Sequence, residues 1–442
     1  MKKYIKEFFG LTFVSCLIFP FSYKIKFWVF GIPFNLLEVL IFLSFIGIGI
    51  FELFGEEFET KEKESFFSKL FKVSLFILFC SLVFSFYISP EKRRALGIIK
   101  SWFVMPLIFG YLVRKFTYTK ERLKDLIYSF GLGGILLSVV SLFGGLFIKD
   151  FWVEGRLKVF FESPNYISLF LVPVFSFFFA MLSLSVKTWN KNDKIFYSVV
   201  SFLSLATVVL TKSRAGIIVS IASIVLSLFI SYIVSKSENE NGDMTFGNAL
   251  FVSVGLMVVT LSFFVLSLFN NQRYQNSDSV RILIWNESLL IAKEKLLTGV
   301  GLGNFQSFFY NRTKELTNFP EFVSPNALFP HNLYLTFLLE SGVLGLISFL
   351  VIVFCCILVL FKSFFEIKYK LEHFSRYENV ESKKESLIFF LLVNSSVLVS
   401  IASILLYGIF DTPIWKNDLS IQFAFLLSLS FVFDNFWIRF LE

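Results

Sequence analysis

One histidine in this sequence has the type and the setting of a residue that moves protons. His331 lies in the segment Pro-His-Asn-Leu-Tyr, between a long polar stretch and a long apolar one. The other of the two histidines, His373, lies in a charged segment with no comparable setting. Because neutral imidazole accepts a proton near physiological pH, His331 is a candidate general base. A polar residue that merely caps a helix would look the same, and the sequence leaves both interpretations open.

A second chemical feature is a set of arginines in the connections between apolar segments. Arg214 lies in the tight turn Thr-Lys-Ser-Arg-Ala-Gly, and Arg281 begins an amphipathic stretch. Arg156 precedes a Pro-Asn pair, which is a helix-start signal and gives Asn165 a structural interpretation. Guanidinium groups bind phosphate oxygens through two parallel hydrogen bonds. The arginines therefore indicate an anionic ligand, such as a lipid phosphate or pyrophosphate.

Composition indicates the kind of scaffold that must position these residues. The chain has 442 residues, of which 56% are hydrophobic, and its mean hydropathy is +0.73. No soluble globular protein of this length needs such a composition, and the apolar runs recur at bilayer-crossing length. We expect an all-α polytopic membrane protein with about 12 transmembrane helices, at 7–23, 34–54, 68–88, 95–113, 124–148, 166–186, 194–211, 215–235, 246–269, 331–361, 386–410 and 418–440.

The distribution of charge predicts which side each connection faces. The first apolar run follows a basic N-terminus but precedes no small-residue cleavage site, so we expect a retained helix with its start inside. The connections 114–124, 187–194 and 362–384 are then cytoplasmic, and all are basic, as the positive-inside rule requires. The long loop 270–330 faces the periplasm. We interpret the outer segment Lys92-Arg93-Arg94 as residues that reach lipid headgroups.

The large loop has an internal pattern of its own. Residues from Ser279 to Leu297 have apolar side chains at near-helical spacing, namely Ile282, Trp285, Leu289 and Leu296. This pattern predicts an amphipathic helix that lies on the outer surface and covers a cavity. The sequence Thr-Gly-Val-Gly-Leu-Gly at 298–303 follows it. Because no strand precedes this segment and its spacing is not that of a dinucleotide fingerprint, we interpret it as a flexible turn.

The start of the following apolar segment predicts a membrane helix that carries the histidine. Pro330 suits a first helical turn, because that turn needs no N–H from the residue, and this would place His331 in the same turn. The helix dipole there disfavours the imidazolium ion. Gly342 and Gly345 lie on the His331 side and leave room for another backbone. Glu340 points the opposite way, so we expect it to bond a neighbouring helix.

Taken in order, these segments resemble the O-antigen ligase and polymerase superfamily. The resemblance covers roughly residues 150–360 and rests on Ser163-Pro-Asn165, Ser213-Arg-Ala-Gly216, Arg281 with Trp285 and Thr298–Gly303, and Pro330-His331-Asn-Leu-Tyr with Glu340-Ser-Gly342. Members of this superfamily are bacterial inner-membrane glycosyltransferases that use glycans linked to undecaprenyl pyrophosphate. The resemblance thus implies an active site that faces the periplasm and takes part in lipopolysaccharide biosynthesis.

The resemblance also implies roles for individual residues. Arg214 and Arg281 would hold the pyrophosphate, with Arg156 as a further ligand, and His331 would act near the acceptor. Three residues would be structural near the site: Glu340, Gly342 and Asn165. The family is reported to use neither a metal nor a nucleotide cofactor, and the sequence shows no carboxylate cluster on the outer face that suggests a divalent cation.

The implied partners and organisation follow from the same resemblance. The donor would be an undecaprenyl-pyrophosphate-linked glycan and the acceptor a lipid A-core or another glycan, with membrane lipids around the chain and no nucleic acid. We divide the chain into N-terminal transmembrane helices at 1–148, a ligase- or polymerase-like catalytic region at 149–361, and a cytoplasmic loop with C-terminal helices at 362–442.

Other functions remain open at this point. The nearest alternative to an inverting O-antigen ligase is an O-antigen or capsular polysaccharide polymerase, and the next is a protein O-oligosaccharyltransferase. A single sequence shows no code for the acceptor. A transporter of lipids or anions belongs to another class, and it would place polar groups near the bilayer midplane and show internal repeats. Here the charges lie at helix ends and no repeat is apparent.

Overall fold

The fold is a bundle of long apolar helices with short elements gathered at one end. The computed structural model describes residues 10, 12–29, 32–53, 65–117, 119–184, 190–235, 272–316, 323, 327–373 and 381–439. Its helices are α2 (Leu36–Leu53), α3 (Phe66–Ile88), α4 (Lys92–Ile98), η2 (Ile99–Val104), α5 (Met105–Phe116), α6 (Lys120–Phe147), α7 (Pro164–Ser183), α8 (Lys191–Leu210), α9 (Arg214–Ser235), α11 (Gln272–Glu294), α12 (Phe305–Thr313), α13 (Leu333–His373), α14 (Glu381–Tyr407) and α15 (Asn417–Arg439).

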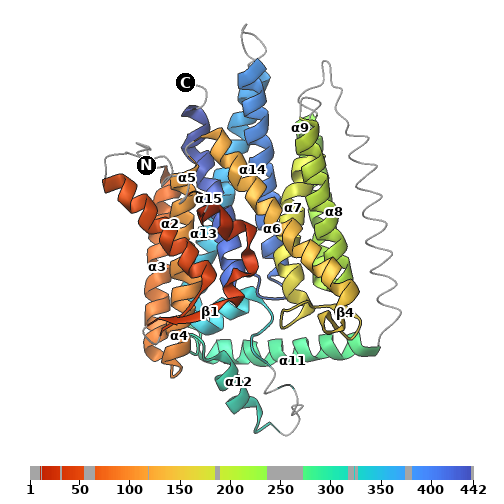
Figure 1. Cartoon of the computed structure of the whole chain (residues 1–442). Coiled ribbons are helices and arrows are strands. Elements are labelled where there is room, and N and C mark those ends of the chain that lie inside the picture. The colour runs from red at the N-terminus through yellow and green to blue at the C-terminus, as the bar shows by residue number, and fades with distance from the viewer. Residues whose placement is uncertain are drawn as a thin grey trace.

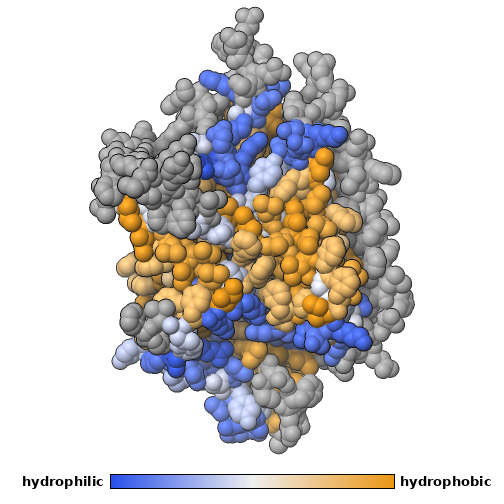
Figure 2. Space-filling model, in the orientation of Figure 1, coloured by the Kyte–Doolittle hydropathy of each residue, from blue (hydrophilic) through white to orange (hydrophobic). Residues whose placement is uncertain are grey.

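The helices confirm a predominantly α-helical, multi-pass membrane protein. Within the described residues, 8 helices are long and apolar enough to cross a membrane, and the apolar parts of α2 and α15 are shorter. Each of these ten helices coincides with one of the expected spans. The expected span 246–269 and the start of the span 7–23 lie outside the described residues, so the count of twelve stays a prediction. On the face seen in Figure 2, an apolar band crosses the middle of the bundle, with polar residues toward both ends.

Two helices form the centre of the bundle. The apolar window of α7 is 94% buried and that of α14 is 89% buried, whereas the corresponding window of α3 is 28% buried. Helix α7 packs against α8, α9 and α14, while α3 packs on α13 and α5 packs on α15 (Figure 1). Because α3 contributes one stripe to the core and leaves the rest apolar and uncovered, its outer face is suited to lipid.

The structure also contains two β-hairpins, which the sequence did not predict. Strand β1 (Lys26–Val29) pairs antiparallel with β2 (Ile32–Asn35), and β3 (Trp152–Val153) pairs with β4 (Arg156–Leu157). The 3₁₀ turns η1 (Pro20–Lys24) and η3 (Lys149–Phe151) precede them. Both hairpins lie at the same end of the bundle as α4, α11 and α12 (Figure 1).

The expected amphipathic helix is present as α11, which lies across that end of the bundle (Figure 1). The buried side is not the predicted one. Ile282, Leu289 and Leu296 are exposed by 47% or more, whereas Ile284 and Ile291 are buried. The reason is tertiary, because α12, Val323 and Ala327 supply apolar partners to the Ile284 and Ile291 side. The surface that we predicted to be buried is therefore turned outward.

Candidate functional site

The polar site at this end of the bundle is built around His331 and a carboxylate from a distant connection. Helix α14 ends at Tyr407 and α15 begins at Asn417, and Asp411 lies between them with 8% of its surface exposed. The Nδ1 atom of His331 is 3.5 Å from Oδ1 of Asp411. That separation is an ion-pair distance and is longer than a well-formed hydrogen bond. The carboxylate faces Nδ1, and Nε2 is the ring nitrogen left to meet a substrate.

The position of His331 corrects the sequence analysis. Helix α13 begins at Leu333, so His331 lies outside its first turn. Asn332 takes the capping role, because its Oδ1 accepts a hydrogen bond from the N–H of Leu335 at 2.9 Å. His331 has φ +50°, a left-handed conformation that residues other than glycine adopt mainly under constraint. The ring therefore faces Asp411 from a position before the helix, and not from within its first turn as predicted.

Three hydrogen bonds fix the segment that carries His331. The N–H of Leu333 donates to the carbonyl of Gly408 at 2.7 Å, and Nδ2 of Asn332 donates to the carbonyl of Ile409 at 3.0 Å. On the other side, Nε1 of Trp285 in α11 donates to the carbonyl of Pro330 at 2.8 Å. The histidine is thus held between the α14–α15 connection and the helix that crosses the end of the bundle.

Two of the predicted site residues bond to one another beside Asp411. Nη2 of Arg156 donates to Oδ1 of Asn165 at 2.7 Å, and Nε of Arg156 donates to the carbonyl of Thr211 at 3.0 Å. Nδ2 of Asn165 lies 3.5 Å from Oδ2 of Asp411. Asn165 is the second residue of α7, as its helix-start signal predicted, and it also links Arg156 to the carboxylate.

Electrostatics keep the carboxylate ionised. Burial by itself raises the pKa of Asp411, but the contact and charge of His331, the charge of Arg281 and the N–H of Thr412 outweigh it. The net effect holds the pKa of Asp411 below its usual value. Arg281 of α11 thus contributes positive charge to the surroundings of Asp411, which precedes α15.

Arg214 is placed at the same cluster through its neighbours. It is the first residue of α9, and Oγ of the preceding Ser213 is 2.8 Å from the hydroxyl of Tyr407, at the end of α14. The hydroxyls of Thr211 and Ser168 lie 2.6 Å apart and tie the same turn to α7. The structure therefore brings the turn of Arg214, the helix of Arg281, and Arg156, Asn165 and His331 to one place.

Glu340 and Gly342 lie in a separate clasp between α13, α3 and the glycine-rich segment. Glu340 accepts a hydrogen bond from the N–H of Gly303 through Oε2, and its carbonyl accepts one from Ser85 of α3. We expected Glu340 to bond a neighbouring helix. Its carboxylate instead reaches a loop, and the helix contact is made by its backbone. Both contacts join α13 to neighbouring segments, so Glu340 stabilises the packing of this clasp.

The glycine-rich segment is a packed turn, so its interpretation as a flexible one was wrong. Gly299, Gly301 and Gly303 all have positive φ, between 67° and 95°. The N–H of Val300 donates to the carbonyl of Leu339 at 2.7 Å, and the N–H of Val343 donates to the carbonyl of Leu296 at 2.9 Å. These bonds cross from the segment to α13 in both directions, which fixes the turn against the helix.

Helix α13 is interrupted at Gly342, where the glycine-rich turn packs against it. Its φ is +73° and its ψ is −178°, so the helix is interrupted there and is not continuous as predicted. A Cβ atom at Gly342 would overlap the carbonyl oxygen of Leu297, and one at Gly345 would overlap Ser341 and approach Ser81. The close approach of another backbone at Gly342, which the sequence predicted, is confirmed.

We expect Gly342→Ala to destabilise the protein. The new side chain would require both a left-handed backbone and displacement of the Leu297 carbonyl, at a cost of about 1–3 kcal/mol for the backbone strain alone. Thermal unfolding in detergent measures the effect. The matched control is Gly49→Ala in α2, where an added Cβ meets nothing within 4 Å. Equal melting temperatures for the two variants would contradict this account.

Sequence reasoning missed Asp411 and Tyr407. A signal was available, because Asp411 is an ionisable residue in a short connection between two apolar spans, where such residues are costly and often functional. Its partner was not visible, since 80 residues of sequence separate it from His331. Among the described residues, no group of three or more His, Cys, Asp or Glu could hold a metal ion.

The lowered pKa of Asp411 predicts a pH dependence of stability. A depressed folded-state pKa contributes stability above the unfolded pKa of about 3.9, and that contribution is lost as the pH falls through the folded value. We therefore expect Asp411→Asn to lower the melting temperature at pH 6–7 and to differ less from the parent below about pH 4. Asp150→Asn, an exposed change in η3, is the control. If Asp411→Asn lowered the melting temperature by the same amount at every pH, the result would contradict this prediction.

Comparison with known proteins adds an independent finding. The family model described as O-Antigen ligase matches residues 199–350. That range begins in α8 and ends in α13, and it contains Arg214, Arg281, His331 and the glycine-rich clasp, whereas Arg156 and Asp411 lie outside it. No curated protein matches the chain. Residues 199–350 are thus similar to the O-antigen ligase family, and this match supports the superfamily that the sequence motifs resemble.

Proposed function

We propose that this protein is a glycosyltransferase that moves a glycan from undecaprenyl pyrophosphate to a lipid A-core acceptor at the periplasmic face of the inner membrane. One observation carries the proposal. His331 faces Asp411 at 3.5 Å, and the cluster around this pair contains Arg156, Arg281 and the start of α9, within an O-antigen ligase domain. The family match supports a ligase- or polymerase-type transferase, and the acceptor is our proposal.

The geometry supports a base-assisted displacement. Asp411 faces Nδ1 and favours the neutral tautomer that carries its proton there, which leaves Nε2 free to accept the proton of the acceptor hydroxyl. The acceptor oxygen then forms a bond to the anomeric carbon while the bond from that carbon to the pyrophosphate oxygen breaks. The electron pair leaves with the pyrophosphate, and direct displacement inverts the anomeric centre.

The arginines can stabilise the leaving group in the same step. Charge grows on the pyrophosphate as its bond to the sugar breaks, and fixed guanidinium groups stabilise that charge. We assign this role to Arg214 and Arg281. Arg156 already uses two donors on Asn165 and Thr211, so we assign it mainly to positioning Asn165 and Asp411. The proposed step uses no metal and no nucleotide.

The depth of the site favours a transferase over a transporter. His331 and Asp411 lie in connections between helices, at the end of the bundle where α11 crosses. A transport pathway would place such groups near the bilayer midplane. The polymerase alternative shares this geometry and differs in its acceptor, which is a second lipid-linked glycan.

A reconstituted assay tests the proposal and separates the two acceptors. The purified chain in nanodiscs would receive an undecaprenyl-pyrophosphate-linked oligosaccharide and, in separate reactions, lipid A-core or a second portion of the donor, both with a metal chelator. Glycosylated lipid A-core, detected by mass spectrometry, is the expected product. Lengthened lipid-linked glycan would instead identify a polymerase, and the absence of transfer in both reactions would overturn the proposal.

A further inference from the structure

A large basic cavity opens beside the His331 cluster and is not explained by it. Its volume is about 670 Å³, within the range of pockets that hold whole small ligands. Segments far apart in sequence line it: η1 with the β1–β2 hairpin, α4 with η2, and the connections that carry residues 328–329 and 416–417. Its basic lining residues are Lys24, Lys26, Arg93, Arg94, Lys100 and Lys416.

The lining of this cavity carries more positive than negative charge. Its two carboxylates are already engaged, because Glu38 lies 2.8 Å from Nζ of Lys100 and Glu162 lies 3.0 Å from Nζ of Lys416. The hydrogen bond and charge of Lys416 lower the pKa of Glu162, so that pair is ionised at neutral pH. Six basic groups against two acids leave a formal excess of four positive charges. Such a lining favours an anion.

This cavity changes the interpretation of the basic segment in α4. The sequence analysis assigned Arg93 and Arg94 to lipid headgroups, but the structure places both in the cavity wall. The guanidinium of Arg93 lies over the ring of Trp28 at 5.9 Å, and Nη1 of Arg94 is 3.5 Å from Oε1 of Gln306. Both side chains are thus positioned by neighbours from other segments.

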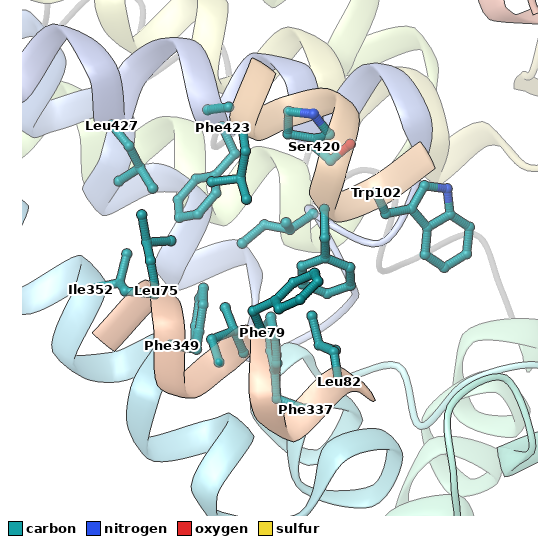
Figure 3. A pocket seen from close by; sticks show the side chains of 16 residues that line it. Leu75, Phe79, Leu82, Trp102, Phe337, Phe349, Ile352, Ser420, Phe423 and Leu427 are labelled. Atoms are coloured by element: carbon teal, nitrogen blue, oxygen red, sulfur yellow. The ribbon is translucent and has the colours of Figure 1, made fainter. Parts of the chain in front are cut away.

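A second, apolar groove shares one lining residue with the cavity and lies in the membrane-spanning part of the bundle. Helices α3, α5, α13 and α15 contribute to its lining, and Figure 3 shows Phe337, Phe349 and Phe423 among the side chains there. Trp102 lines both the groove and the basic cavity. Along the groove, Phe79 and Leu107 are 42% and 44% exposed, so the groove is open to the surrounding lipid. The lining of the groove itself is almost wholly apolar.

The cavity also adjoins the proposed base. Phe329 lines the cavity and is two residues from His331, and Lys416 lines it and is five residues from Asp411. The two connections that form the His331–Asp411 pair therefore continue into the cavity wall. Figure 1 shows β1 and α4 toward one end of α11 and β4, which carries Arg156, toward the other. The elements that line the basic cavity and the hairpin that carries Arg156 thus lie toward opposite ends of α11.

We infer that the cavity and the groove together bind a second, phosphate-bearing lipid, whose attached glycan presents its hydroxyl to His331. This inference rests on the proposed transferase function and assigns the acceptor side of that site. Phosphate would meet the excess cations, and the lipid chain would lie along the groove past Trp102.

Counting bound lipids tests the inference without relying on transfer. The probe is geranylgeranyl pyrophosphate, added to the full chain in zwitterionic nanodiscs and counted by native mass spectrometry. We expect two molecules per chain. Lys26→Gln with Arg93→Gln should remove one, weakening that site about ten- to hundredfold, and Arg281→Gln should remove the other. Lys149→Gln with Lys293→Gln, the same charge change at exposed positions, should leave both.

The outcomes separate this inference from the proposed function. If the Lys26 and Arg93 variant still binds two molecules with parental affinity, the cavity is not a lipid-phosphate site. If the parent binds one molecule and the Lys26 and Arg93 variant binds none, the cavity is a lipid-phosphate site and Arg281 does not hold the donor. If the parent binds one molecule and only Arg281→Gln loses it, the inference is overturned.

A further arm distinguishes a lipid from a free anion. Inorganic pyrophosphate should compete for the cavity at least about tenfold less well than the prenyl compound, because it gains nothing from the apolar groove. Ala424→Phe, which fills the groove, should weaken the prenyl compound and leave inorganic pyrophosphate unchanged, with thermal unfolding as the check on folding. Equal competition by the two probes would assign the cavity to a free anion and contradict the lipid.

Discussion

His331→Gln should transfer glycan about 10²–10⁴-fold more slowly than the parent, because glutamine retains polar contacts but cannot accept the proton of the acceptor hydroxyl. The loss should appear in turnover, with donor binding nearly unchanged. The side chain of His331 is 35% exposed, so its removal leaves no large cavity in the core. A folded variant that binds donor and fails to transfer is therefore the expected result.

The left-handed backbone of His331 calls for a second variant. His331→Asn is suited to φ +50°, because asparagine adopts this conformation more readily than most residues, and it cannot act as a base. Both variants should fail to a similar extent, whereas His373→Gln, the change at the other histidine, should transfer at the parental rate. If His331→Gln transfers close to the parental rate, His331 only positions other groups and the base lies elsewhere.

Arg281→Gln should lower transfer about 10²–10³-fold, the typical cost of removing one group that stabilises charge in a transition state. Arg281→Lys should recover part of this loss, since lysine keeps the charge but lacks the planar fork that binds two phosphate oxygens. Unlike the His331 variants, both should also bind the donor more weakly. The measurement is donor affinity and turnover on the same preparation.

Charge removal elsewhere on α11 provides the control for Arg281. Lys293→Gln, near the exposed end of the same helix, should change neither donor affinity nor turnover. Because the charge of Arg281 contributes to the low pKa of Asp411, Arg281→Gln should also narrow the pH range over which Asp411 supports stability. Unchanged donor binding in Arg281→Gln would place the pyrophosphate away from this arginine.

Part of the candidate site followed from local sequence. Arg156, Arg214 and Arg281 stood out because they lie in connections that the predicted topology places outside, where the positive-inside rule expects few basic residues, and His331 stood out as one of only two histidines. The structure places these residues, or the turns that carry them, in one cluster. The site could not be completed from sequence, since its carboxylate, Asp411, reaches His331 only through the packing of the α14–α15 connection against the start of α13.

Other predictions from the sequence were wrong for the same reason. A periodic pattern predicted that α11 is a helix, but α12 decided which of its faces is buried. Proline at 330 suggested a helix start, but Asn332 provides a better cap and leaves His331 outside. Three glycines looked like a flexible turn, yet hydrogen bonds from α13 hold them in place. Each error concerns a contact between segments, which local spacing does not encode.

The sequence by itself determined the class of this protein, its helical bundle and the residue types available for chemistry. These properties depend on the length of apolar runs and on where polar residues interrupt them, and both are local. Only the tertiary structure decided that His331 meets Asp411, that α13 breaks at Gly342 around the glycine-rich turn, and that six basic residues from five segments form one cavity. Such features arise from the packing of distant segments, where the cost of burying each polar group is offset by a partner that only the fold supplies.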